Sequence, residues 1–247
     1  MNKILQTFVI APFLIALGTG LFFTSHIVMA WSISKEQQGI MHLEPNLKKG
    51  RNLFRTCAVC HAPTAWGTPD GHYPQIASQH QQVVIKQMLD IRSGNRDNPT
   101  MYPFTLKSVM KSDQDIANVS AYVASLPMSP YNEKGSGMDL QHGKALYDKH
   151  CTECHGDNGE GDNKSTFPRV HGQHYHYILR QLLWMQNGKR RNANDDMLKK
   201  IRTFNMRDLD AVSDYISRLP VADNLKAKQG WNNPDFSQNF RSRMPNQ

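Results

Sequence analysis

Cysteine is scarce in this chain, and the few residues present fall in two close pairs. The 247 residues include four cysteines, which form the pairs Cys57/Cys60 and Cys151/Cys154. An even number of cysteines in an exported protein ordinarily indicates disulfides. Pairs as close as these, each followed directly by a histidine, indicate a different use. Because there is no fifth cysteine, none is left to serve as an additional metal ligand.

Long apolar runs are also missing, except at the N-terminus. Mean hydropathy is −0.59 and 39% of the residues are hydrophobic, values typical of a soluble protein. After Lys3, however, the stretch from Ile4 to Met29 has no charged side chain. It is longer than the core of a signal peptide, about 7–15 residues, and can span a bilayer, which takes about 20.

Residues 1–31 are therefore expected to be a signal peptide or a membrane anchor helix. The length of the run and an interfacial position for Trp31 favour the anchor. Either segment would deliver the rest of the chain to the periplasm, in the second case tethered to the inner membrane.

Acidic side chains are outnumbered by basic ones, 21 to 29, which gives a net charge of +8 and an isoelectric point near 9.3. Nucleic acid is not expected as the partner of an exported protein of this kind. The positive charge would instead steer an acidic partner protein or attract an anionic membrane surface. The alternative is an ordinary solvated surface around residues 189–191 and 199–200.

Two segments share the pattern Cys-x-x-Cys-His, at residues 57–61 and 151–155. On a helical turn, sulfurs at i and i+3 point to one side, where each can add to a heme vinyl group, and the next histidine can bind the iron. Two copies predict two covalently bound heme c groups. A zinc site would have to join ligands from both halves. The predicted residues are Cys57, Cys60, His61, Cys151, Cys154 and His155.

The two motifs lie in two copies of a longer pattern. Each is preceded by a glycine-containing amphipathic segment and followed by Pro-x-x-x-x-Gln-His, at residues 74–80 and 168–174. Each copy then has a helical segment that ends at glycine, followed by Gly-x-Arg-x-Asn and a last helical segment that stops at Leu-Pro.

This repeat predicts an all-α protein with two tandem domains, at residues 46–127 and 138–220, preceded by the hydrophobic helix. Residues 221–247 form a C-terminal extension with little helical pattern, containing Trp231, Phe236 and Phe240. We expect it to wrap the domain that precedes it, with docking on another subunit as the alternative.

A heme that only exchanges electrons is usually closed by a second axial ligand, often a methionine thioether. Met101 and Met197 lie at equivalent places between the glycine-ended segment and the last helix, where a loop can fold over the iron. Other methionines fall at helical positions that are more often core. The rival ligands are His80 and His174, which occupy equivalent positions at the start of a predicted helix.

Pro74 and Pro168 have a possible supporting role. A carbonyl in each of these loops could accept the Nδ1 proton of His61 or His155 and so orient the ring toward iron. The simpler alternative is a turn proline.

Together, the repeated heme motif, Pro-x-x-x-x-Gln-His, Gly-x-Arg-x-Asn and loop methionine resemble the cytochrome c4 family over residues 47–220. The resemblance implies two class I cytochrome c domains in a pseudo-twofold arrangement, with neighbouring hemes at the interface. It implies the axial ligand pairs His61/Met101 and His155/Met197. The loop after His61 departs from the family in lacking its Gly-rich sequence.

The resemblance also implies electron transfer between a membrane or periplasmic donor and a terminal oxidase or other acceptor. Two other functions stay open from the sequence. One is a diheme enzyme, a peroxidase or thiosulfate-oxidising cytochrome, which would need iron coordination unlike two His/Met pairs. The other is a fixed cytochrome subunit of a membrane respiratory complex, held through the N-terminal segment.

Overall fold

The computed structural model describes residues 34–237 and residue 240. The predicted N-terminal helix, residues 1–31, lies outside these residues. The described residues belong to one compact unit. Within the described part, regular structure consists of helices and three isolated β-bridges, which confirms the all-α prediction. No helix in that part of the chain is both long and apolar enough to cross a membrane.

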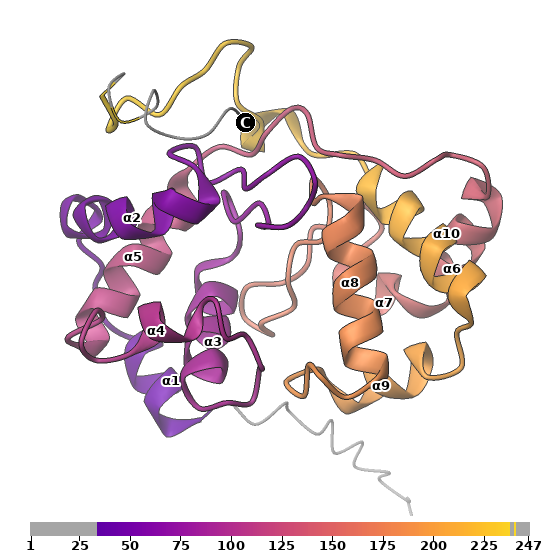
Figure 1. The fold of residues 1–247 in the computed structure, drawn as a ribbon, viewed down its shortest axis with the longest axis horizontal. Coiled ribbons are helices and arrows are strands. Elements are labelled where there is room, and N and C mark those ends of the chain that lie inside the picture. The colour runs from indigo at the N-terminus through magenta and orange to yellow at the C-terminus, as the bar shows by residue number, and fades with distance from the viewer. Residues whose placement is uncertain (1–33, 238–239, 241–247) are drawn as a thin grey trace, which may run out of the picture. The chain divides into compact units, whose positions relative to one another are not determined.

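The first domain is built around the packing of α2 on α5 (Figure 1). The two helices approach closely because Gly50 lies at their contact, where an added Cβ would be 2.1 Å from the backbone oxygen of Asn118. Helix α5 begins with a capping box between Ser112 and Asp115. The helices are α1 (Lys35–Met41), α2 (Leu47–His61), α3 (Gln81–Arg92), α4 (Tyr102–Thr105) and α5 (Asp113–Ser125).

The second domain repeats this arrangement, with α6 packed on α10. Gly143 takes the place of Gly50, and a Cβ there would lie 2.1 Å from the backbone oxygen of Ala211. Asn205 and Asp208 form the capping box of α10. The elements are α6 (Leu140–His150), α7 (Thr152–His155), α8 (Tyr175–Gln186), α9 (Asp195–Ile201), α10 (Met206–Ser217) and the 3₁₀ helix η1 (Asp223–Leu225). Two tandem helical domains are thus confirmed.

The C-terminal extension does not stay with the second domain, so that expectation was wrong. It first pairs with the interdomain linker through backbone bonds between Met128 and residues Leu225 and Ala227. It then runs over the first domain (Figure 1), and the side chain of Phe236 is buried in the core of that domain. The aromatic residues were visible in the sequence, but an irregular segment has no periodicity that identifies which surface it covers.

Candidate functional site

The first heme motif ends α2 and holds its histidine in one defined orientation. The side chain of His61 is buried, and its Nδ1 donates a hydrogen bond of 3.0 Å to the carbonyl oxygen of Pro74. A carbonyl can only accept, so Nδ1 carries the proton and Nε2 of the neutral ring keeps a lone pair. Burial lowers the pKa of His61, which favours that neutral form. The ring is therefore prepared to bind a metal through Nε2.

The second motif has the same geometry although its helix is broken. The chain leaves α6 at Cys151 and resumes as the short helix α7, which ends at His155. Nδ1 of His155 donates to the carbonyl oxygen of Pro168 at 2.9 Å, and burial lowers the pKa of the ring. The hydrogen bonds predicted for Pro74 and Pro168 are both present.

The four cysteines are free thiols in the structure. Burial raises the pKa of Cys57 and of Cys151 to about 12, whereas a redox-active dithiol has a lowered pKa. Among the described residues, no group of three or more His, Cys, Asp or Glu side chains is arranged to hold a metal ion. The two thiols and the imidazole of each motif are thus not arranged as the closed four-ligand set of a structural zinc site, and they fit covalent heme attachment better.

Met101 and Met197 each lie at the start of a short helix between the two longer helices of their domain. Met101 is the N-cap of α4, and Met197 lies in the first turn of α9; both are partly buried. Three of the competing methionines are buried core residues, namely Met88, Met110 and Met185. Met101 and Met197 remain the predicted sixth ligands.

His80 and His174, the rival ligands, contact the opposite domain instead. Nε2 of His80 donates to the carbonyl oxygen of Glu160 at 2.9 Å, and Nε2 of His174 donates to that of Trp66 at 2.8 Å. Trp66 and Glu160 follow the two heme motifs at equivalent places. Each histidine thus binds the loop that follows the heme motif of the other domain, which the sequence did not reveal.

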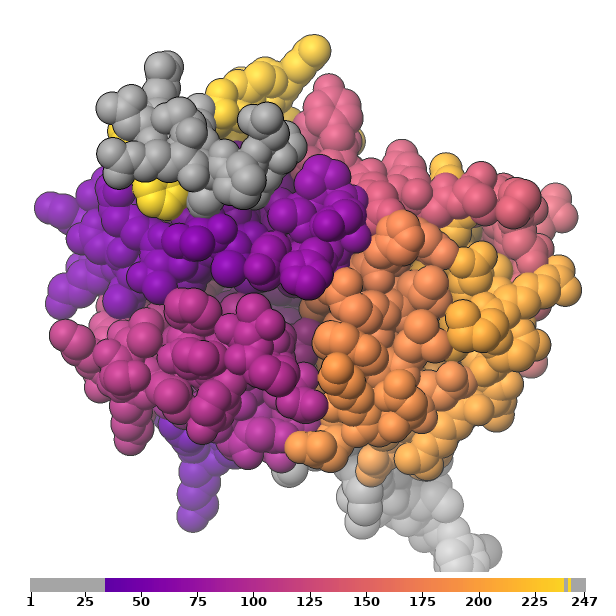
Figure 2. Space-filling model, viewed as in Figure 1, coloured from indigo at the N-terminus to yellow at the C-terminus, as the bar shows by residue number. Residues whose placement is uncertain are grey.

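The glutamines next to these histidines form a second reciprocal pair of contacts. Gln79 accepts from the backbone N–H of Arg169 and donates to its carbonyl, both at 2.9 Å. Gln173 makes the same two bonds to Gln75, at 3.1 and 2.8 Å. The repeated Gln-His pair therefore builds the domain interface, and its reciprocity confirms the pseudo-twofold arrangement. On the face shown in Figure 2, the first domain and the orange segment around α8 meet directly.

Two arginines lie at the same interface, and the side-chain hydrogen bonds found for them within the described part of the chain go to neutral oxygens. Arg96 donates to the side-chain oxygens of Gln87 and Gln181 at 2.8 and 2.9 Å, and Arg190 shares both acceptors. Burial, followed by the charge of Arg96, lowers the pKa of Arg190 to about 9. Arg96 is buried and Arg190 is partly buried, and guanidinium groups held by neutral oxygens fit an anionic group, such as the carboxylates of heme. The repeated Gly-x-Arg was the signal in the sequence.

Comparison with known proteins agrees with this geometry. The cytochrome c family model matches residues 47–127 and 140–220. Cytochrome c4 of Azotobacter vinelandii is 29% identical over 197 residues, and that of Pseudomonas aeruginosa is 31% identical over 189 residues; each match spans 73% of this chain and 92% of the relative. The crystal structure of reduced recombinant cytochrome c4 from Pseudomonas stutzeri superposes with a TM-score of 0.61 at 25% identity, over 72% of this chain and 100% of that one.

Proposed function

The chain belongs to the cytochrome c4 family, and we propose that it passes electrons through two His/Met-ligated hemes, His61/Met101 and His155/Met197. Membership makes it a diheme electron-transfer protein with two covalently bound heme c groups. The observation that carries the histidine half of this proposal is the matched pair of hydrogen bonds from the two buried imidazoles to Pro74 and Pro168, and the methionine half is supported by the equivalent positions of Met101 and Met197 at the starts of α4 and α9. Heme supplies the one-electron chemistry when bound.

The residues of the chain would each have a separate role at these sites. The thiols of the two Cys-x-x-Cys pairs would hold the groups as thioethers. The carbonyls of Pro74 and Pro168 keep the histidine rings in the tautomer that offers Nε2 to iron. Arg96 and Arg190 would offset the charge of the heme carboxylates at the interface, where their present partners are neutral amide oxygens and, for Arg96, the hydroxyl of Tyr177.

Closed coordination favours a carrier over an enzyme. An iron with protein ligands on both faces has no open position for peroxide or a sulfur anion, and it rearranges little on electron transfer. We infer that donor and acceptor are redox proteins, a membrane or periplasmic donor and a terminal oxidase or other acceptor. The periplasm is the proposed location, with the N-terminal segment as a tether to the inner membrane.

Two measurements test this proposal. The mass of the denatured holoprotein should include two hemes, because both attachment motifs are complete. Purified protein should exchange electrons rapidly with redox partners and should not sustain turnover of peroxide or thiosulfate. Turnover of either compound at the rate of electron exchange would support the diheme-enzyme alternative and refute the carrier proposal.

A further inference from the structure

We propose that the C-terminal extension supplies positioning residues to the first heme site: Asn233 and Trp231 hold the loop that follows His61. Within residues 221–237, no equivalent hydrogen bond or ring contact to the second heme loop is found, and that loop is braced from within its own domain. This inference rests on the proposed role of His61 as an iron ligand. It concerns residues 221–240, which lie beyond the family match that ends at residue 220.

The contacts of Asn233 are directed at that loop. Its side chain is fully buried, and its Nδ2 donates to the carbonyl oxygen of Pro63 at 2.7 Å. Pro63 is two residues after His61. Farther along the loop, the ring of Trp66 lies 5.8 Å from the ring of Trp231 in the extension. The loop that begins at His61 and returns to Pro74 is thus held at two points by the distant C-terminal segment.

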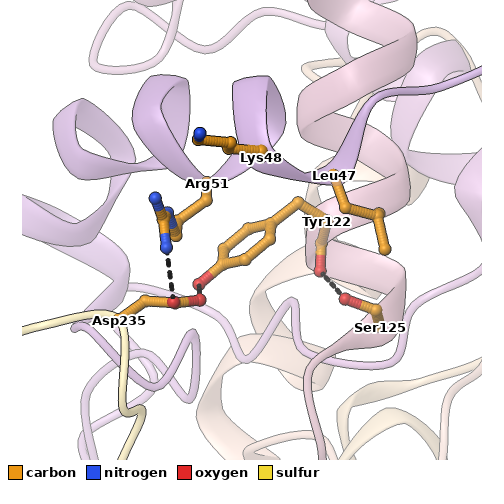
Figure 3. A pocket seen from close by; sticks show the side chains of 6 residues that line it. All are labelled: Leu47, Lys48, Arg51, Tyr122, Ser125 and Asp235. Carbon is orange, nitrogen blue, oxygen red and sulfur yellow. Dashed lines mark hydrogen bonds and ion pairs between the residues drawn. The ribbon is translucent and has the colours of Figure 1, made fainter.

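The extension is itself held in place on the first domain by side-chain contacts. The side chain of Phe236 is 4% exposed and packs edge-on to Phe54 in the core of the first domain, with 5.9 Å between the ring centroids. Asp235 accepts a hydrogen bond of 2.8 Å from the hydroxyl of Tyr122 and pairs with Arg51 at 3.1 Å (Figure 3). The segment from 231 to 236 is therefore part of the first domain.

The second domain makes the equivalent contacts from its own residues. Tyr147 stands where the first domain has Phe54, and its hydroxyl donates to the carbonyl oxygen of Gly156 at 2.7 Å, directly after His155. Phe54 has no hydroxyl, so that position cannot brace the first loop. The amide of Asn233 provides a donor to the first loop instead, at the carbonyl of Pro63, one residue beyond the counterpart of Gly156.

Helix α6 pairs a cation with an anion of its own, whereas the anion that pairs with α2 comes from the extension. In the second domain, Lys144 has an ion-pair partner one turn later in its own helix, Asp148. The first domain has Arg51 and Arg55 at the corresponding places, two cations. The anion there is Asp235 of the extension, which binds Arg51 through its side chain and Arg55 through its backbone oxygen. The first domain is therefore incomplete without the extension.

The first loop also needs more support than the second. Ala62 and Ala65 have φ angles of 62° and 61°, in the left-handed region that disfavours alanine. The second loop has Gly156 and Gly159 at these places, with φ angles of 76° and 74°, where glycine is unstrained. A loop strained at two alanines will relax if its outside contacts are removed.

Loss of these contacts should change the redox potential of one heme only. The loop carries the carbonyl that orients His61. The rings of Trp66 and Trp231, which pack against the core of the first domain, would limit the access of water to this loop. Water near the iron stabilises the more highly charged ferric state, so the potential of the first heme should fall when the cover is opened. The potential of the second heme should not change.

The experiment compares Asn233→Ala with Asn232→Ala in the full-length holoprotein. Asn232 is exposed, and its side chain binds the backbone oxygen of Gly230 within the extension. Spectroelectrochemical titration should resolve one step that moves to lower potential in Asn233→Ala and in Trp231→Ala. It should stay in place in Asn232→Ala and largely in Trp231→Phe, which keeps an aromatic ring. The displaced step is assigned to the first heme with Met101→Ala, which alters that step alone.

The outcomes separate this inference from the proposed function. If the parent protein lacks two hemes, or lacks the near-infrared band of Met-ligated iron, the proposed function fails. If the parent has both, and the titration of Asn233→Ala superimposes on that of Asn232→Ala, the inference alone is overturned. Equal shifts of both steps also overturn it, because they indicate a general loss of structure. If Asn233→Ala does not fold, the Trp231→Ala and Trp231→Phe pair decides in the same way.

Discussion

The reciprocal glutamines should be the principal polar support of the domain interface, and replacing them tests this directly. Gln79→Ala removes two hydrogen bonds to the backbone of Arg169, and Gln173→Ala removes two to the backbone of Gln75. At roughly 0.5–1.5 kcal/mol per bond, each variant should lose about 1–3 kcal/mol of stability. At about 2–4 °C per kcal/mol for a chain of this size, the melting temperature should fall by several degrees.

Differential scanning calorimetry of the holoprotein gives the required measurement. If the interface couples the domains, the single-site variants should separate the unfolding of one domain from that of the other. The double variant should show a loss that is not the sum of the two, since both residues support one interface. Gln229→Ala, at an exposed position in the extension, is the control. If Gln79→Ala melts at the same temperature as this control, the glutamines are not the principal polar support of the domain interface.

Three further predictions concern the heme sites and the helix contacts. Met101→Ala and Met197→Ala should each remove the near-infrared Met-to-iron band of one heme; survival of the band excludes that methionine as ligand. Gly143→Ala should destabilise the second domain by about 1–3 kcal/mol or more, because the added Cβ overpacks α6 against α10. In Gly188→Ala no atom lies near the added Cβ, so this variant should lose only about 1 kcal/mol of stability, through its φ of 78°. Equal melting temperatures of the two variants would contradict the close approach of α6 and α10. Arg190→Gln should lower the reduction potential of one heme in redox titrations at low salt, because the lost cation had disfavoured the ferric state. Unchanged potentials in both steps would contradict a contact between Arg190 and the heme carboxylates.

The sequence predicted what local patterns determine. The helices follow from apolar periodicity and from stop signals, namely the glycines that end the middle segments and the Leu-Pro pairs that end the last ones. The heme motifs are local too, because one helical turn brings both sulfurs and the histidine together. The proline carbonyls were predictable because the loop between motif and proline has the same length in both copies.

Contacts between distant segments were not predictable in the same way. The sequence presents His80 and His174 as possible iron ligands, yet each binds a carbonyl in the other domain. Nothing in one copy of the repeat encodes the partner, since the contact exists only when two copies face each other. The path of the extension was missed for a related reason: Phe236 fits beside Phe54, and this fit depends on packing that a single sequence does not display.

The interface and the extension act on the same part of the molecule. The carbonyl of Trp66, in the loop after His61, accepts from His174 of the second domain, while the ring of Trp66 packs on Trp231 of the extension. In the second loop, the equivalent carbonyl of Glu160 accepts from His80, and no aromatic residue of the extension is in ring contact there among the described residues. The interface therefore makes the same contact to each of the two heme loops, whereas the ring contact and side-chain hydrogen bond found for residues 231–233 of the extension go to the first loop. A protein built from two similar domains can in this way acquire two different heme environments without changing the attachment motifs themselves.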